Sequence, residues 1–455
     1  MSIIAGYLLP HQANLLLRQK SGEGEKTLLA YKEVGEQIAR LKPDTIIIVT
    51  PHMESYRDYV QIADGEVGSG RLSYRGRGEY KFRILYDKPL AKEIAMVCSL
   101  SDFPAGMDGE QEGSLDHGTM VPLFFLNRSY SSFKAVRIGV SGLSLYDHYR
   151  LGRLISRAVA SLGRKAVIIA SGDLSHAHDV EGHIEAAERY ERAFMNSLAR
   201  ANFGALLNFS RRELHLSGEC CQRPATVLAG AFDRENVEAK VLSREVLNEV
   251  GLAVASFLPR GSNPSRAYLD LYLAKEKMRI MTKRSQSDSV ARLAYAALDY
   301  YVKERGRLPI PSWVPASLRN QRAGVFVSFS KFGSPRGCLG TCFAREGNLA
   351  NEIVSNTIAS ASSDPRYGEV RADEVPYIEI KVDVLARPER VNDPALLNPE
   401  RFGLIVEHGE KRGVLLPRLD GITSADEQLD VALKKGRFEK GENYSLFRFL
   451  SVSHR

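Results

Sequence analysis

The stretch Thr45–Met53, TIIIVTPHM, predicts the fold of the first half of the chain. Three isoleucines and a valine form a run that is too short for a helix, and β-branched residues favour strands. Such a run is typical of a strand that is buried on both faces of a parallel sheet. Pro51 ends the run because proline cannot donate to the ladder. His52 then lies where α/β sheets usually bind ligands, although by itself it is more typical of a loop histidine with a satisfied hydrogen bond.

Further apolar runs and helical patterns surround this strand. We predict strands at Ile3–Leu8, Val136–Val140, Ala166–Ser171 and Gly251–Leu258. Helical spacing of apolar residues predicts helices at Tyr31–Leu41, Pro89–Leu100, Leu151–Leu162, Val180–Phe209 and Ala225–Phe232. Alternation of strands and helices is typical of an α/β domain, in which helices flank a central, mostly parallel sheet. We assign residues 1–262 to this domain.

Composition restricts the class of protein. A length of 455 residues predicts at least two domains, and 44% hydrophobic with 26% charged residues is typical of a globular protein. The start of the chain, MSIIAGYLLPHQ, has no basic region, and no segment has 18 apolar residues in a row, so we expect a cytoplasmic protein without membrane contact. A net charge of +7, spread along the chain, does not indicate nucleic acid as a partner. The five cysteines lack CxxC spacing, which argues against a zinc knuckle.

Three histidines follow three separate predicted strands. They are His11, His52 and His176, and Glu219 stands before a predicted helix. If the strands are parallel neighbours, these four side chains meet at one edge of the sheet. Two imidazoles and one carboxylate form the facial triad that suits Fe(II) and leaves positions open for substrate and dioxygen. A further histidine is suited to proton transfer at neutral pH. Scattered loop histidines are the other interpretation.

A family resemblance adds to this pattern. Residues 1–262 resemble the LigB-type class III extradiol dioxygenases, a superfamily that also includes the Memo-like proteins. The resemblance rests on four motifs in order, LPH at Leu9–His11, PH at Pro51-His52, LDHGTMVPL at Leu115–Leu123 and SGDLSH at Ser171–His176. It implies a non-haem Fe(II) ion held by His11, His52 and Glu219. It also implies that His176 is the acid/base residue and that His117 binds or protonates the substrate.

The third metal ligand varies across the superfamily, which has Glu in ring-cleaving members and Cys in Memo-like ones. This chain has Glu219 and Cys220 side by side. We predict Glu219, since a thiolate would favour a softer metal or a redox role. Zinc is an alternative ion, because imidazole and carboxylate also bind it. Asp173 and Ser175 are expected to orient His176, and the two histidines that follow, His178 and His183, are expected to face solvent.

The last part of the chain forms a second predicted domain. Residues 263–286 are predicted to form a linker helix, and residues 287–455 an α+β domain. The motif PRGCLGT at Pro335–Thr341 resembles the AMMECR-type domain, whose biochemistry is poorly defined. We interpret Cys338 as a buried structural thiol rather than a nucleophile. Arg336 and Arg366 could bind an anion or could form surface ion pairs.

Two functions follow from these resemblances. The first is an Fe(II)-dependent oxygenase that opens the ring of a catechol-like diol with O2, with His176 taking the proton of the diol. The second is a Memo-like metal-binding or peptide-binding module that works with a protein partner and does not cleave rings. The fusion favours this alternative, because Memo-like and AMMECR-type proteins resemble parts of a recurring set that also contains a radical SAM enzyme. A homo-oligomer is compatible with either function.

Overall fold

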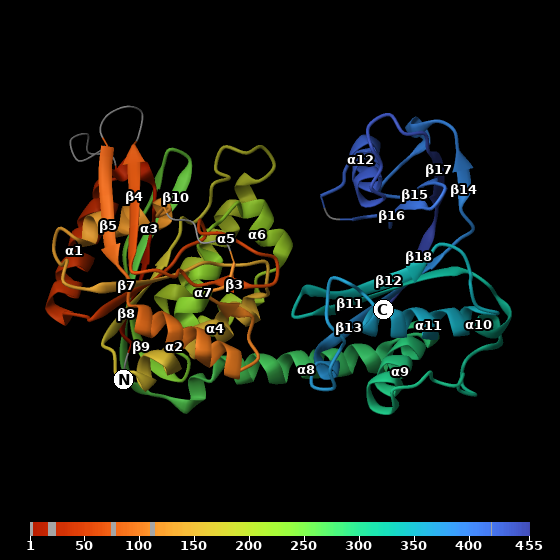
Figure 1. The fold of residues 1–455 in the computed structure, drawn as a ribbon, viewed down its shortest axis with the longest axis horizontal. Helices are drawn as coiled ribbons and strands as arrows, with labels where there is room; N and C mark the ends of the chain where they lie inside the picture. The colour runs from red at the N-terminus through yellow and green to blue at the C-terminus, as the bar shows by residue number, and fades with distance from the viewer. Residues whose placement is uncertain (1–2, 17–23, 74–78, 110–113, 420) are drawn as a thin grey trace. The chain divides into compact units, whose positions relative to one another are not determined.

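The computed structural model of the chain has two compact units, Met1–Ala274 and Lys275–Arg455 (Figure 1). The structure describes residues 3–16, 24–73, 79–109, 114–419 and 421–455. In the first unit six strands form one sheet, in the order β7-β2-β8-β1-β10-β9. Their bounds are β1 Ile3–Leu9, β2 Thr45–Val49, β7 Lys134–Ile138, β8 Ala166–Ser171, β9 Glu235–Leu247 and β10 Val250–Ser262.

The strand directions confirm the predicted, mostly parallel sheet. Strands β7, β2, β8 and β1 pair in parallel, whereas β10 runs antiparallel to β1 and pairs with β9 as a hairpin. The sequence analysis did not predict β9. Its residues alternate between half-buried and exposed along much of its length, as expected of an edge strand with one solvated face.

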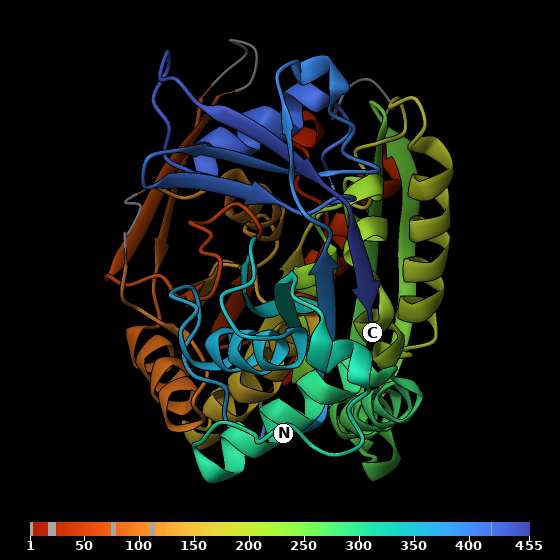
Figure 2. The same cartoon turned by 90° about the vertical axis from the view of Figure 1, so that its right-hand side faces the viewer.

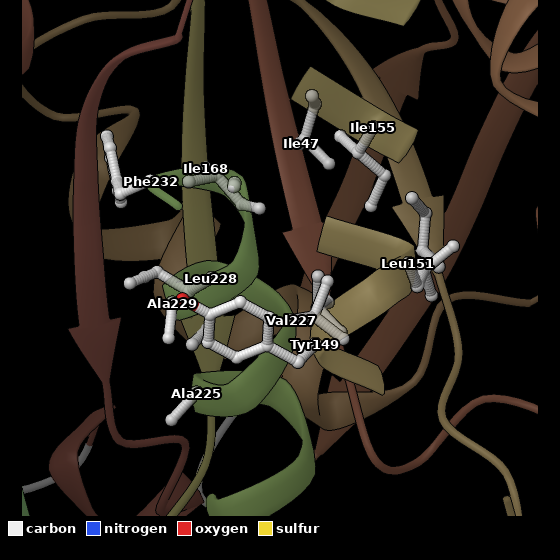
Figure 3. Close-up of a cluster of buried hydrophobic side chains, with 14 of the residues drawn as sticks. Ile47, Tyr149, Leu151, Ile155, Ile168, Ala225, Val227, Leu228, Ala229 and Phe232 are labelled. Carbon is white, nitrogen blue, oxygen red and sulfur yellow. The ribbon is translucent and has the colours of Figure 1, made fainter. Parts of the chain in front are cut away.

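Successive side chains of the central strands point to opposite faces of the sheet, so the core has one part on each face. Ile47 and Val49 belong to one buried cluster, which includes residues of helices α2, α4 and α7 (Figure 3). Ile46 and Ile48 belong to a second cluster with residues of α1 and α3. All five residues of β2 are fully buried. The TIIIV run is therefore apolar throughout because helices cover both of its faces.

The helices of the first unit are α1 Glu25–Leu41, α2 Lys88–Leu100, α3 His117–Leu126, α4 Leu145–Ser161, α5 Ile184–Ala199, α6 Arg211–Ser217 and α7 Gln222–Ala231. Helix α5 packs against the β9–β10 hairpin (Figure 2). The prediction of one helix over Val180–Phe209 is wrong in extent. Ala201 has a left-handed φ of 46°, which interrupts the helix, and a short 3-10 helix follows at Phe203–Asn208.

Small two-stranded pairs complete the sheets of the first unit, and a long helix begins within this unit and ends in the second. The pairs are β3 Val60–Gln61 with β6 Ala105–Gly106, and β4 Val67–Ser73 with β5 Glu79–Leu85. Helix α8 spans Tyr268–Gln286. No helix in the described part of the chain is both long and apolar enough to cross a membrane.

The second unit has the predicted α+β fold. Two four-stranded antiparallel sheets have the orders β12-β11-β13-β18 and β14-β17-β15-β16. Their bounds are β11 Gly324–Lys331, β12 Ser334–Thr341, β13 Ile378–Leu385, β14 Glu389–Val391, β15 Gly403–His408, β16 Lys411–Leu415, β17 Ser445–Phe449 and β18 Ser451–His454. The helices are α9 Ser289–Glu304, α10 Ala316–Asn320, α11 Leu349–Ser362 and α12 Ala425–Lys435.

The PRGCLGT motif forms β12, at the edge of the first of these sheets. A Cβ at Gly337 would lie 2.4 Å from the carbonyl oxygen of Ser360, so glycine allows the end of α11 to pack against the strand. The backbone N–H of Cys338 donates to Asp364 at 2.8 Å. Arg366 pairs with the same carboxylate at 2.6 Å. The motif therefore joins an edge strand to the segment after α11, and the Cys338 thiol is half-buried rather than buried.

Helices α4 and α7 cross at two glycines, and this contact generates a stability prediction. A Cβ at Gly230 would lie 1.9 Å from the carbonyl oxygen of Tyr149, and one at Gly152 would lie 2.0 Å from that of Val227. Because backbone atoms block the added methyl group, we expect Gly230→Ala to lower the free energy of unfolding by about 1–3 kcal/mol in chemical denaturation. Arg157→Ala, on the exposed side of α4, is the control and should change it by less than about 0.5 kcal/mol. Equal stability of Gly230→Ala and wild type would contradict this account.

A buried ion pair makes the stability of the second unit depend on pH. Burial tends to raise the pKa of Glu374, but its bonds with Arg336 and Lys331 outweigh this effect and hold the pKa at about 2. A carboxylate with a lowered pKa stabilises the fold above its unfolded pKa of about 4.3, and this contribution is lost as the pH falls toward 2.

We therefore expect Glu374→Gln to destabilise the second unit by about 1–3 kcal/mol at pH 7. The difference from wild type should shrink as the pH falls from about 4.5 to 2. Denaturation curves across this range measure both effects. A difference that stays constant with pH would show that the charge of Glu374 is not what stabilises the unit.

Candidate functional site

The carboxyl ends of three neighbouring parallel strands bring histidines together. His11 follows β1, His52 follows β2, and Asp173 and His176 follow β8, which lies between those two strands. The Nε2 atoms of His11 and His52 are 3.0 Å apart. The ring of His117, the first residue of α3, lies with its centroid 4.0 Å from that of His52. The structure thus brings the three strand-end histidines, His11, His52 and His176, to one edge of the sheet as expected, and His117 joins them from the start of α3.

The structure brings Cys220, and not Glu219, to this group. The Sγ atom of Cys220 lies 3.5 Å from Nε2 of His11. One donor atom from each of His11, His52 and Cys220 lies within 4.8 Å of the others. The carboxylate of Glu219 instead accepts a bond of 2.6 Å from the backbone N–H of Gln222, at the start of α7. Free N–H groups at a helix start attract a carboxylate, which accounts for the direction of Glu219.

A close loop contact places Cys220 in the site. A Cβ at Gly172 would lie 2.4 Å from the Cα atom of Cys221, so only glycine permits this approach. The backbone N–H of Asp173 then donates to Sγ of Cys220 at 3.1 Å, and the N–H of Cys220 donates to the carbonyl of Asp173. Gly172 of the SGDLSH motif therefore serves to bring the two loops together.

Hydrogen bonds fix the tautomer of His11. The single proton of the Ser171 hydroxyl goes to the carbonyl of Gly118, at 2.6 Å. Nδ1 of His11, 2.9 Å from the same oxygen, must therefore donate to it. This leaves the lone pair of Nε2 directed toward His52 and Cys220. An oriented imidazole of this kind is what a metal ligand requires.

Burial keeps the two imidazoles neutral. It lowers the pKa of His11, against the opposing effect of Asp173. Burial together with the neighbouring histidines lowers the pKa of His52 to about 4. Burial raises the pKa of the Cys220 thiol, and the adjacent carboxylate of Asp173 adds to the rise. Burial also raises the pKa of Glu219 to about 7. Neutral imidazoles are competent ligands at pH 7, whereas Cys220 requires a bound cation to become a thiolate.

A buried charge network holds the DHG motif. Asp116 caps α3 by accepting the N–H of Thr119 at 2.9 Å, and it accepts the hydroxyl of Thr50 at 2.7 Å. That hydroxyl in turn accepts the N–H of His52. Arg137, 2% exposed on β7, lies 3.4 Å from the carboxylate of Asp116. Arg137 was not among the predicted site residues. An arginine inside the apolar run VRIGV was nevertheless a signal, because a buried charge requires a partner.

His176 lies at the outer edge of the site. Its side chain is 39% exposed, and its Nε2 atom is 3.6 Å from Oδ2 of Asp173 and 3.7 Å from Sγ of Cys220. Asp173 is fully buried and accepts bonds of 2.9 Å from the N–H of His11 and the side chain of Gln12. Ser175, also expected to orient His176, donates to the carbonyl of Ser217 instead. Of the two residues expected to orient His176, Asp173 contacts it.

The prediction that His178 faces solvent is wrong. Its side chain is 13% exposed, and its Nε2 atom lies 2.8 Å from the buried carboxylate of Glu191 on α5. Arg244 of β9 pairs with the other oxygen of Glu191 at 3.0 Å. His178 therefore helps to attach the loop after β8 to α5.

Comparisons with known proteins agree with this architecture. Residues 5–255 match the family model described as "Catalytic LigB subunit of aromatic ring-opening dioxygenase", and residues 291–453 match the AMMECR1 model. Protein CA_C1420 of Clostridium acetobutylicum is 33% identical over 469 residues, which cover all of both chains. A Thermotoga maritima protein is 40% identical over 158 residues, 34% of this chain and 91% of its own.

Two solved structures are also similar. Uncharacterized protein PH0010 from Pyrococcus horikoshii has a TM-score of 0.34 and 27% identity, covering 36% of this chain and 88% of its own. Uncharacterized protein JW3007 from Escherichia coli K12 has a TM-score of 0.40 and 15% identity, and the match covers 56% of this chain and 99% of that protein. The family models and the full-length relative lead to one conclusion. The chain belongs to the LigB family, with its LigB domain fused to an AMMECR1 domain.

Proposed function

We propose that the LigB domain is a metal-dependent oxidoreductase. His11, His52 and Cys220 would hold a transition-metal ion, and His176 and His117 would transfer protons for a small hydroxyl-bearing substrate. The observation that carries this proposal is the convergence of two Nε2 atoms and one Sγ atom at the carboxyl edge of a buried sheet. When bound, the ion would supply Lewis-acid and redox chemistry at its open coordination positions.

The donor atoms fit a metal ion. Bond lengths of about 2.1 Å to nitrogen and 2.3 Å to sulfur place two tetrahedral ligands about 3.6 Å apart. Nε2 of His11 and Sγ of Cys220 are 3.5 Å apart. The lone pair of His11 is directed into the site by the bond of Nδ1 to Ser171. The thiolate also makes this donor set softer than a set with Glu219, and it shifts the preference from Fe(II) toward Cu(I) or zinc.

The residues around the ion are placed for proton transfer. His176 is partly exposed and close to Cys220, so its Nε2 atom can take a proton from a substrate hydroxyl that enters from solvent. His117, packed against His52, can return a proton to the product.

Ring opening of a catechol-like diol with O2 on Fe(II) is the specific reaction that family membership supports. The second candidate is a metal-binding or peptide-binding module that acts with a protein partner, such as a radical SAM enzyme, in the cytoplasm. The position of Cys220 favours this candidate, because Memo-like proteins carry a cysteine as third ligand.

Substitution of the two adjacent residues tests the ligand set. We expect Cys220→Ala to lower the metal content of the purified protein severalfold, because it removes one donor of the cluster. Glu219→Gln should leave the metal content unchanged, since its carboxylate caps α7. Elemental analysis gives both values and identifies the ion. Loss of metal in Glu219→Gln but not in Cys220→Ala would overturn the proposed site.

Oxygen uptake tests the reaction. Protein reconstituted anaerobically with one equivalent of Fe(II) is mixed with O2 and a panel of catechols. If it opens rings, His176→Gln should lower the rate by roughly 10²- to 10⁴-fold, because it removes the proton acceptor. His215→Gln, an exposed histidine of α6, is the control and should keep the rate. Absence of uptake by wild type with every diol would exclude ring opening and favour the partner-dependent module.

A further inference from the structure

We propose that Asp173, His176 and Cys220 form a second cation position, which binds zinc and thereby removes His176 from proton transfer. This inference rests on the proposed role of Cys220 as a metal ligand and adds a regulatory site to it. The second position shares Cys220 with the first, which comprises His11, His52 and Cys220.

The distances within this second group suit a zinc ion. Nε2 of His176 lies 3.7 Å from Sγ of Cys220 and 3.6 Å from Oδ2 of Asp173. All three donor atoms lie within 4.8 Å of one another. Two ligands of a tetrahedral zinc ion are expected about 3.4–3.6 Å apart for this combination of oxygen, nitrogen and sulfur. Imidazole, thiolate and carboxylate are also the three side-chain types that zinc binds in proteins.

The charge of Asp173 is the independent observation that points to a cation. Its side chain is fully buried, and its two hydrogen-bond donors, the backbone of His11 and the side chain of Gln12, are both uncharged. Among the described residues its ion-pair partners are only His11 and His176, with no lysine or arginine. A buried carboxylate without a cation is costly, and a metal ion near Oδ2, which lies 3.6 Å from Nε2 of both His11 and His176, would compensate for it.

An ion can reach the second position from solvent, and two ions can share Cys220. The His176 side chain is 39% exposed, so an ion can reach the second position from solvent, whereas His11 is 2% exposed. Sγ of Cys220 is close to both histidines, 3.5 Å from Nε2 of His11 and 3.7 Å from Nε2 of His176. A thiolate sulfur carries more than one lone pair, so it can bind an ion on each side.

A zinc ion in this position would block proton transfer by Nε2 of His176. Zinc bound to Nε2 of His176 uses the lone pair that would otherwise take the proton of the substrate. The first position would keep His11 and His52 and so retain its own ion. The structure thus predicts that a first equivalent of metal supports activity and that a second equivalent of zinc inhibits it.

Zinc stoichiometry tests this inference without relying on activity. Metal-free full-length protein and its variants are equilibrated with Zn(II) and dialysed, and bound zinc per chain is measured by elemental analysis. We expect two zinc ions in wild type and one in His176→Ala. We expect one in His52→Ala, and at least tenfold weaker binding of both ions in Cys220→Ala. His215→Ala, an exposed histidine outside both groups, should bind two.

The outcomes separate this inference from the proposed function. One zinc ion in both wild type and His176→Ala, lost in His52→Ala, would overturn the second position and leave the first intact. Full zinc binding by Cys220→Ala would overturn the ligand set itself, and both proposals with it. In protein loaded with one equivalent of metal, a further equivalent of zinc should lower turnover at least tenfold. Unchanged turnover with two ions bound would overturn the inhibitory role.

Discussion

Burial of both faces of the parallel strands is the constraint on which the first unit depends. Strands β7, β2, β8 and β1 pair side by side, and β2 has no exposed residue. Helices must therefore cover both faces, and polar side chains can gather only where the strands end. This requirement explains why an apolar sequence such as TIIIV leads directly into a histidine. The position of the site follows from the burial of the sheet.

Loop contacts determine which side chains reach that edge. Gly172, in the loop after β8, and Gly118, in the first turn of α3, lie where a Cβ would meet neighbouring atoms at 2.4 and 2.5 Å, so glycine allows both close contacts. The first contact brings Cys220 beside Asp173, and the second places the start of α3 against Thr50. Polar networks behind the histidines then fix their orientation. The site is therefore a product of close backbone packing as much as of its histidines.

Close packing also explains the most distinctive motif of the AMMECR1 domain, PRGCLGT. Gly337 lets α11 approach an edge strand, and Asp364 satisfies the backbone N–H of Cys338. Arg336 pairs with the buried Glu374 and Arg366 pairs with Asp364, so both arginines form ion pairs instead of presenting a free anion site. A rare sequence pattern can thus reflect packing at the edge of a sheet.

The sequence alone determined the two-domain α/β and α+β organisation and the positions of the strand-end histidines along the chain, because apolar periodicity is a local property. It could not decide between Glu219 and Cys220, since adjacent side chains point in different directions according to where a helix begins. Nor could it place Asp173 beside both His11 and His176, because its loop position depends on contacts with residues distant in sequence. Tertiary packing turned Glu219 to the start of α7 and Cys220 to the histidines.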